Sequence, residues 1–294
     1  MITIQNEIIS AGINPKGAEL VSLIHKASQI DHMWSADPKF WGKSSPVLFP
    51  IIGSLKNDAF IYKNQEYALP RHGFARDRVF EIEKQTEDSV VFLLTHDDAS
   101  LQVFPFTFEL RLHYTIEANQ LKVKYEVKNT GNDTMFFSVG GHPAFKVPFA
   151  DGTAYNDYYL EFNKEEDLKR WPLTNSGLVE TNPEEMSTYS TRVPLTKKLF
   201  YEDALVFKHL ESDSVTLKSD KTSSQLKFQF EGFPFLGIWA AKDADFVCIE
   251  PWCGIADSVT HNQQLEEKEG INALAPAENF ERTWIVEIGN GVNE

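Results

Sequence analysis

The chain has 294 residues, enough for one large domain or two ordinary ones, and its composition is that of a globular protein. Its 43 acidic residues against 28 basic ones give a formal net charge of −15. Because that charge repels phosphate backbones and anionic lipid, general nucleic-acid binding and membrane-surface binding are excluded as leading functions. The net charge does not exclude a locally basic pocket inside the acidic surface.

Segments that would direct the chain to a membrane or out of the cell are not expected. No apolar run approaches the roughly 18 to 20 residues of a membrane span, and residues 1–10 lack the basic region and long apolar core of a signal peptide. The two cysteines, Cys248 and Cys253, are too few for a disulfide framework or a thiolate metal cage. The sequence therefore predicts a cytoplasmic protein with two free thiols.

Apolar and polar residues alternate along much of the chain, which predicts strands with one buried face. In chain order, we predict a hairpin at 60–69, a pair of strands at 78–85 and 89–96, three consecutive antiparallel strands joined by short turns at 106–116, 121–127 and 135–139, and further strands at 225–230, 236–241, 246–250 and 283–288. So many short strands, separated by frequent turns, predict an all-β protein built as an antiparallel sandwich or barrel.

Helix is expected only locally, where 164–170 and 263–269 could each form a turn or two. The polar, proline-punctuated stretch 171–198 is either a domain linker or a long excursion over one sheet. We favour the excursion, and with it a single domain over residues 1–294.

Two histidines stand in unusual surroundings. His142 follows two glycines at the end of a predicted strand, where glycine permits unusual backbone angles and close approach of a ligand, and Pro143 then stops ladder pairing. His72 lies just past the predicted hairpin, flanked by Arg71 and Arg76. Each histidine alone is explained better as a turn residue that bonds to backbone.

Two carboxylates are further candidates. Glu250 comes directly after four residues of buried-strand character, so partial desolvation should raise its pKa and make it a usable base near neutrality. Trp252 beside it offers a flat apolar face of the kind that stacks on sugar C–H groups. An exposed Glu250 at the strand end beside a core Trp252 explains the pattern equally well. Asp203 precedes another apolar strand and could bind a polyol hydroxyl, although aspartate at such a position is also common in turns.

A metal site has little support, because His72, His142 and Glu250 lie far apart in sequence and no H-x-H or H-E-x-x-H spacing occurs. The chain also lacks a G-x-S-x-G elbow, a Walker lysine loop and a G-x-G-x-x-G fingerprint.

Five segments together resemble the aldose 1-epimerase (galactose mutarotase-like) family, in the bacterial branch related to hexose-6-phosphate 1-epimerases. They are FPIIG (49–53), HGFAR (72–76), GGHPAF (140–145), the strand after Asp203, and CIEPWCGIAD (248–257), in the family's order over about 200 residues. Each motif alone is weak, but five in order are a strong signal.

The resemblance implies a large antiparallel β-sandwich of the supersandwich type, with the active site in a cleft on one sheet. It implies that Glu250 is the general base and His142 the general acid. His72 and Asp203 would then hold sugar hydroxyls or the ring oxygen, with Arg71 and Arg76 positioning the substrate. Interconversion of α and β anomers needs one acid and one base, so no metal or organic cofactor is expected.

One departure concerns substrate choice. The family usually carries an arginine directly after FPIIG, where this chain has Ser54, so substrate contact there is altered or passes to Lys56. The expected ligand is a small-molecule sugar or sugar phosphate, bound by a monomer or homodimer. Free hexoses are the preferred substrates in this interpretation, and hexose 6-phosphates are the alternative substrates for an epimerase. A non-catalytic sugar-binding module on the same fold is the alternative to an enzyme. A glycoside hydrolase or lyase ranks low, since hydrolysis needs two suitably spaced carboxylates.

Overall fold

The computed structural model describes residues 1–290, with the side chains of residues 187–189 and 290 outside that description. The alternation in the sequence becomes regular strands: β10 (Phe108–Glu117) and β11 (Gln120–Asn129) bury every second side chain over nearly their whole lengths. Since side chains in a strand point to opposite faces in turn, this pattern places one face of the sheet against a core and the other toward solvent.

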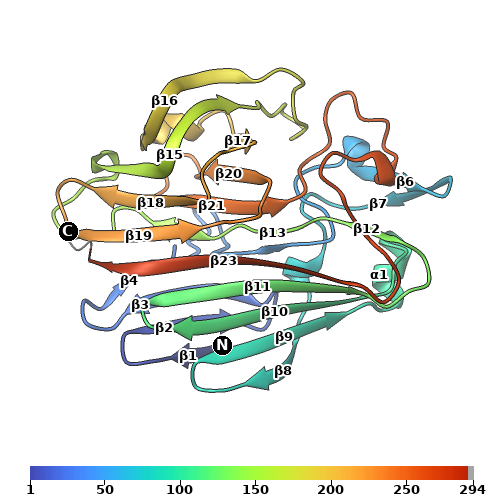
Figure 1. Ribbon diagram of the computed structural model, residues 1–294, viewed down its shortest axis with the longest axis horizontal. Helices are drawn as coiled ribbons and strands as arrows, with labels where there is room; N and C mark the ends of the chain where they lie inside the picture. Colours follow the sequence, from blue (N-terminus) through green and yellow to red (C-terminus); the bar gives the residue numbers. More distant parts are fainter. Residues whose placement is uncertain (291–294) are drawn as a thin grey trace.

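The largest sheet is antiparallel throughout and has nine strands. Their order is β16 (Glu184–Pro194), β15 (Tyr158–Arg170), β18 (Ser214–Ser219), β19 (Ser224–Gln229), β23 (Asn279–Asn290), β11, β10, β9 (Ser89–Thr95) and β8 (Glu81–Gln85). Figure 1 shows β23, in red, between β11 and β19 at the middle of this sheet.

A six-stranded sheet forms the second layer. It runs β17 (Leu205–Lys208), β20 (Phe235–Trp239), β21 (Phe246–Cys253), β13 (Val139–Gly141) and β5 (Val47–Leu48), and β14 (Ala144–Lys146) also pairs with β21.

Smaller elements surround these layers. They are a four-stranded sheet of β1 (Ile2–Gln5), β2 (Ile9–Asn14), β3 (Glu19–His25) and β4 (Ile30–Asp31), the ribbons β6 (Ala59–Tyr62) with β7 (Gln65–Ala68) and β12 (Met135–Phe137) with β22 (Asn272–Leu274), the helix α1 (Asp98–Val103), and the 3-10 turns η1 (Lys56–Asp58), η2 (Ala75–Asp77), η3 (Tyr155–Asp157), η4 (Lys197–Phe200) and η5 (Leu265–Glu267). No helix within residues 1–290 is long and apolar enough to cross a membrane.

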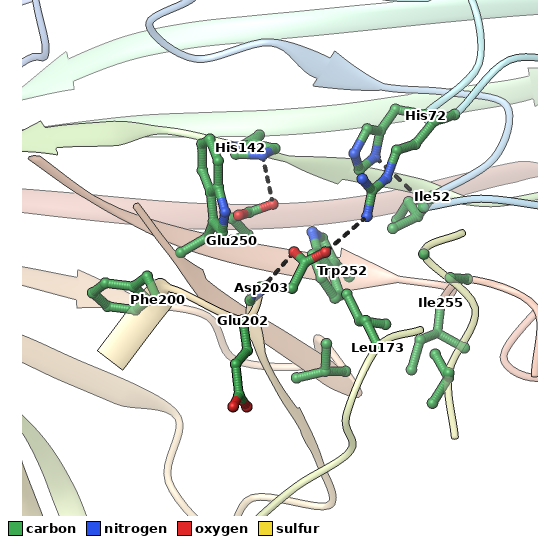
Figure 2. A pocket seen from close by; sticks show the side chains of 18 of the residues that line it. Ile52, His72, His142, Leu173, Phe200, Glu202, Asp203, Glu250, Trp252 and Ile255 are labelled. Atoms are coloured by element: carbon green, nitrogen blue, oxygen red, sulfur yellow. Dashed lines mark hydrogen bonds and ion pairs between the residues drawn. The ribbon is translucent and has the colours of Figure 1, made fainter. Parts of the chain in front are cut away.

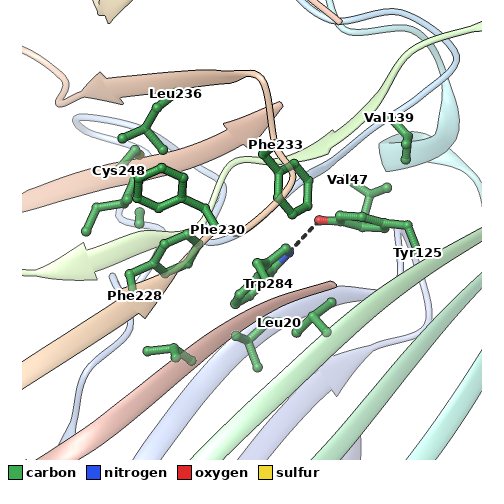
Figure 3. Packing of buried hydrophobic residues seen from close by; sticks show 14 of the residues in the cluster. Leu20, Val47, Tyr125, Val139, Phe228, Phe230, Phe233, Leu236, Cys248 and Trp284 are labelled. Atoms are coloured by element: carbon green, nitrogen blue, oxygen red, sulfur yellow. Dashed lines mark hydrogen bonds between the residues drawn. The ribbon is translucent and has the colours of Figure 1, made fainter. Parts of the chain in front are cut away.

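The core lies between the layers. Phe145 of β14 packs edge-on against Phe228 of β19, with 5.9 Å between ring centroids, so the two large sheets are in direct contact. In the same cluster, the Trp284 indole donates a hydrogen bond to the Tyr125 hydroxyl at 2.8 Å (Figure 3). This arrangement confirms the predicted all-β antiparallel sandwich, while the single domain over residues 1–294 stays a prediction.

Most strand predictions are confirmed, but the partner of one strand is wrong. The 60–69 hairpin forms as β6 and β7, and 81–85 pairs with 89–95. The predicted third strand at 135–139 does not continue the β10–β11 meander: β12 pairs with β22, β13 pairs with β21 and β5, and β23 occupies the place beside β11. Local alternation identifies a strand, but its partner is set by tertiary packing.

The segment predicted to turn helical at 164–170 is instead the second half of β15. Glu166 and Leu168 are buried two residues apart, which is the period of a strand and not of a helix. The polar stretch that follows divides in two. Residues 171–183 cross toward the six-stranded sheet, where the Trp171 amide donates to the Val206 carbonyl at 2.9 Å, and 184–194 return as the edge strand β16. In 263–269 a single 3-10 turn forms, as predicted.

Candidate active site

A cavity of about 440 Å³ opens on one face of the six-stranded sheet. Its floor comes from β17, β20 and β21, and its walls come from the turn after β5, the turn after β7, the 171–183 segment and the residues around η4. Its volume falls within the roughly 300 to 1,000 Å³ typical of small-molecule sites. This cavity holds most of the residues that the sequence singles out.

Glu250 lies on the floor, in the middle of β21. The strand continues to Cys253, so the prediction that Glu250 ends it is wrong, and the carboxylate is more deeply buried than expected, at 1% exposed. Across the ladder it pairs with Gly237. Burial raises the pKa of Glu250 well above its usual range, and the nearby positive charge of Arg71 opposes this only in part.

His142 follows β13, and the two preceding glycines are needed for close packing. A Cβ on Gly140 would lie 2.6 Å from the Pro251 carbonyl oxygen, and one on Gly141 would lie 2.6 Å from the Tyr125 hydroxyl. Neither glycine has a left-handed backbone angle, so the expectation of unusual angles is wrong. The core and the neighbouring strand approach these glycines closely, and approach of a ligand stays a prediction. This close packing places the following residue, His142, against Glu250 of β21.

His142 and Glu250 face each other in the cavity (Figure 2). His142 Nε2 lies 3.3 Å from Glu250 Oε2, although neither Glu250 Oε2 nor His142 Nδ1 has a hydrogen bond of good geometry. The Trp41 ring stacks on the imidazole at 4.8 Å between centroids, and Trp239 meets it edge-on at 5.5 Å. Burial lowers the pKa of His142 to about 3, so burial favours the neutral form of both groups.

His72 is held by the turn after β5. Its backbone amide donates to the Gly53 carbonyl at 2.9 Å, and its Nδ1 accepts from the Gly53 amide at 3.1 Å. With Nδ1 an acceptor, the ring proton lies on Nε2. The ring is 5.8 Å from that of His142 between centroids (Figure 2), and burial lowers its pKa well below the usual value. The structure thus brings His72, His142 and Glu250 together in the cavity.

Asp203 and the two arginines occupy the more exposed side of the cavity. Asp203 Oδ1 accepts from the Ala204 amide at 2.7 Å, and Oδ2 lies 3.8 Å from Arg71 Nη2 (Figure 2). Arg76 Nη2 donates to the Arg71 carbonyl at 2.8 Å, and burial lowers the pKa of Arg76. All three residues line the cavity, and their contact with substrate stays a prediction.

Trp252 also lines the cavity, and its position depends on a glycine that the sequence analysis missed. A Cβ on Gly237 would lie 2.4 Å from the Trp252 ring, so the missing side chain leaves space for the indole. Trp41 and Trp239 were missed as well, although they give the cavity two more aromatic walls. The alternation in 236–241 already places Gly237 and Trp239 on one face of a strand, whereas Trp41 carries no such signal.

Comparison with known proteins identifies the family of the chain. The sequence model described as aldose 1-epimerase matches residues 1–274. The chain belongs to the aldose 1-epimerase family. Among curated relatives, the plasmid-encoded protein LacX of Lactococcus lactis subsp. lactis is 33% identical, covering 98% of this chain and 99% of the relative.

Solved structures of similar proteins cover almost the whole chain. The galactose mutarotase related enzyme from Lactobacillus acidophilus is 36% identical, with a TM-score of 0.95 over 100% of this chain and 98% of that one. A galactose mutarotase-like protein from Lactobacillus casei is 30% identical, with a TM-score of 0.92 over 98% and 100%. These likenesses cover β23, which lies beyond the residues that the family model matches.

Lys56 lies apart from the other predicted site residues. Its Nζ donates to the carbonyl oxygens of Val259 at 3.1 Å and His261 at 3.0 Å, and it does not line the cavity. The predicted transfer of substrate contact to Lys56 is therefore wrong for this arrangement. Ser54 is itself buried under Gly177, where a Cβ would lie 2.7 Å from Ser54 Oγ. A larger side chain at position 54 would collide with that segment.

One group of described residues has donors that could hold a metal ion, and it is not the trio considered from the sequence. The ligand atoms of His142, Cys248 and Glu250 lie within 4.8 Å of one another. Cys248 is completely buried, does not line the cavity, and has a pKa raised well above its usual value by burial. Binding a metal there would require loss of the thiol proton in an apolar environment, which burial opposes.

Proposed function

We propose that this member of the aldose 1-epimerase family interconverts the α and β anomers of a free hexose, with Glu250 as general base and His142 as general acid. The observation that carries the proposal is the buried His142–Glu250 pair, 3.3 Å apart, on the floor of a cavity of about 440 Å³. Opening the sugar ring requires one positioned group that takes a proton from the sugar and another that gives a proton to it.

The reaction balances without any other reactant. Glu250 takes the proton of the C1 hydroxyl while His142 gives a proton to the ring oxygen, so the C1–O bond of the ring breaks and C1 becomes an aldehyde. Rotation about C1–C2 presents the other carbonyl face. Reclosure returns the first proton to O1 and the second to His142, which restores the starting state.

The two pKa directions suggest how the pair is prepared. Before a sugar binds, burial favours neutral imidazole and a protonated carboxyl, and that pair holds one exchangeable proton. Moving this proton over 3.3 Å gives imidazolium and carboxylate, the acid and base that the reaction needs. Sugar hydroxyls that bind both groups would favour this charged form by replacing water with fixed dipoles.

The surrounding residues suit a sugar. Trp41, Trp239 and Trp252 offer flat apolar faces to ring C–H groups. In our proposal, the Nε2–H of His72 donates to a sugar oxygen, and Asp203 accepts from a hydroxyl. Arg71 and Arg76 position the substrate from the open side.

Charge favours a neutral sugar over a sugar phosphate. The carboxylates of Glu202 and Asp203 line the cavity against two arginines, and burial favours the neutral form of the third carboxyl group, Glu250, so a phosphate finds no net positive charge there. Arg71 is already near Asp203, and Lys56 is engaged outside the cavity. A hexose 6-phosphate stays the second candidate, because guanidinium groups bind phosphate well and both arginines line the cavity.

The test is a mutarotation assay by polarimetry on freshly dissolved α-D-glucose, α-D-galactose and glucose 6-phosphate, with Glu250→Gln as the control. Acceleration with a free hexose that disappears in the control would support the proposal, and a preference for glucose 6-phosphate would replace it with the second candidate. Sugar binding without acceleration would favour a non-catalytic binding module. The cytoplasmic location and the monomeric or homodimeric state stay predictions.

A further inference from the structure

The last residue of the CIEPWCGIAD segment has no place in the reaction, yet it forms a buried ion pair. Lys268 Nζ lies 2.6 Å from Asp257 Oδ1, and each side chain is 1% exposed. Neither residue lines the cavity. We propose that the Asp257–Lys268 pair is a positioning element of the sugar site, which holds two cavity walls in place over the catalytic floor. The inference rests on the proposed function for its kinetic part.

The first wall held by Asp257 is the turn after β5. Asp257 Oδ2 accepts from the Lys56 amide at 2.9 Å, and the Asp257 amide donates to the Ser54 carbonyl at 2.9 Å. The turn is therefore fixed at both ends of residues 54–56. Gly53, directly before it, makes both hydrogen bonds that orient His72. A continuous chain of contacts thus joins Lys268 to the imidazole of His72.

The second wall is the 171–183 segment. The Val179 amide donates to the Asp257 carbonyl at 2.8 Å, and the Val259 amide donates back to the Val179 carbonyl at 3.0 Å. Val179 lines the cavity, together with Leu173 and Gly177 of the same segment. Asp257 therefore binds both walls through its backbone or side chain, and it is itself fixed by Lys268.

Burial makes this pair sensitive to loss of one partner. An isolated buried charge is strongly destabilising, whereas removing both charges of a pair with side chains of similar volume is often tolerated. If only Lys268 loses its charge, the nearest remaining cationic partner of Asp257 is the more distant His261, whose Nε2 lies 3.8 Å from Asp257 Oδ1, so Asp257 must turn toward it, move toward water or bind a proton. Each of these responses disturbs the contacts of Asp257 with the backbone of the two walls.

The experiment compares Lys268→Met, the double variant Asp257→Asn/Lys268→Met, and Glu166→Gln as a matched control. Glu166 is a buried carboxylate that accepts from the Ser212 amide at 2.6 Å, and it does not line the cavity. We expect Lys268→Met to raise KM about tenfold or more with kcat changed much less, since small misplacements of binding groups are costly. The double variant should recover most of the loss, because the asparagine side chain that replaces Asp257 keeps an acceptor oxygen for the Lys56 amide.

Hydrogen exchange without sugar supplies a measurement that does not depend on catalysis. In Lys268→Met, peptides covering residues 49–57 and 173–180 should exchange faster than in the unmodified protein, and in Glu166→Gln they should not. Unchanged exchange and unchanged KM, with only a lower Tm, would overturn the positioning role. An unmodified protein without mutarotase activity would overturn the proposed function instead, and the exchange result would still decide this inference.

Discussion

The floor and the open side of the cavity are built differently. Glu250 and His142 lie on or beside central strands of the six-stranded sheet, and Glu250 is 1% exposed. Asp203 and Arg71 lie on turns, with side chains 29% and 45% exposed. Burial therefore shifts the pKa values of the floor residues strongly, while solvent screens the charges on the open side.

This difference assigns separate tasks to the two regions. Buried groups with perturbed pKa values are suited to moving protons, and partly exposed charges are suited to choosing among substrates. Changes to the floor should reduce the rate by large factors, and changes to the open side should alter affinity by small ones.

Replacing the base should have the largest effect. We expect Glu250→Gln to lower kcat by about 10⁴, the upper end for one acid–base group, because the amide cannot accept the C1 hydroxyl proton. Sugar affinity should change little, since Gln keeps the size and one acceptor of Glu. Polarimetry and calorimetric titration measure the two quantities. Glu166→Gln is the matched control, and turnover near that of the unmodified protein would remove Glu250 from the role of base.

Replacing the acid should have a somewhat smaller effect. His142→Asn should lower kcat by about 10² to 10³, because Asn can still donate a hydrogen bond to the ring oxygen but cannot transfer a proton. The double variant with Glu250→Gln should lose little more than Glu250→Gln alone, since the two residues act as a unit. Fully multiplicative losses would contradict a shared proton.

The pH profile separates two ways in which the floor could work. If the His142–Glu250 pair reacts while it holds one shared proton, kcat/KM is constant between the lowered pKa of His142, about 3, and the raised pKa of Glu250. Above the raised pKa that proton is lost, so kcat/KM should fall about tenfold per pH unit. A rate that rises through the same pKa would show that Glu250 must be ionised while His142 stays neutral. The uncatalysed rate at each pH is subtracted.

The strands of this fold were predictable from the sequence because each sheet buries one face, which leaves a period of two along the chain. The pairing was not predictable to the same degree. Nothing within the 121–127 segment specifies that its outer neighbour is β23, at the far end of the described chain. The mistaken helix prediction at 164–170 has a similar cause. Glu166 is a charged residue at a buried position of the strand, so apolar and polar residues do not alternate there.

The residues of the site likewise differ in how far the sequence alone could identify them. His142 and Glu250 could be named as candidates from their local surroundings only together with the resemblance to the family. Residues whose role depends on contact across strands could not be identified: Gly237 matters only because the β20–β21 register places it beside the Trp252 ring. Lys56 was misplaced because its carbonyl partners lie in a loop about 200 residues further along the chain.

The smallest expected effect tests the open side. Asp203→Asn should raise KM for a free hexose only about three- to tenfold, since a partly exposed group contributes one screened hydrogen bond. The same change frees Arg71 from its carboxylate partner, 3.8 Å away, and removes a charge that repels phosphate. We therefore expect kcat/KM for glucose 6-phosphate to rise relative to that for glucose, which competition assays measure. Glu202→Gln is the control, because its side chain is 81% exposed and its charge is better screened. A loss of kcat as large as that of Glu250→Gln would place Asp203 with the proton-transfer groups and erase the distinction between the two regions.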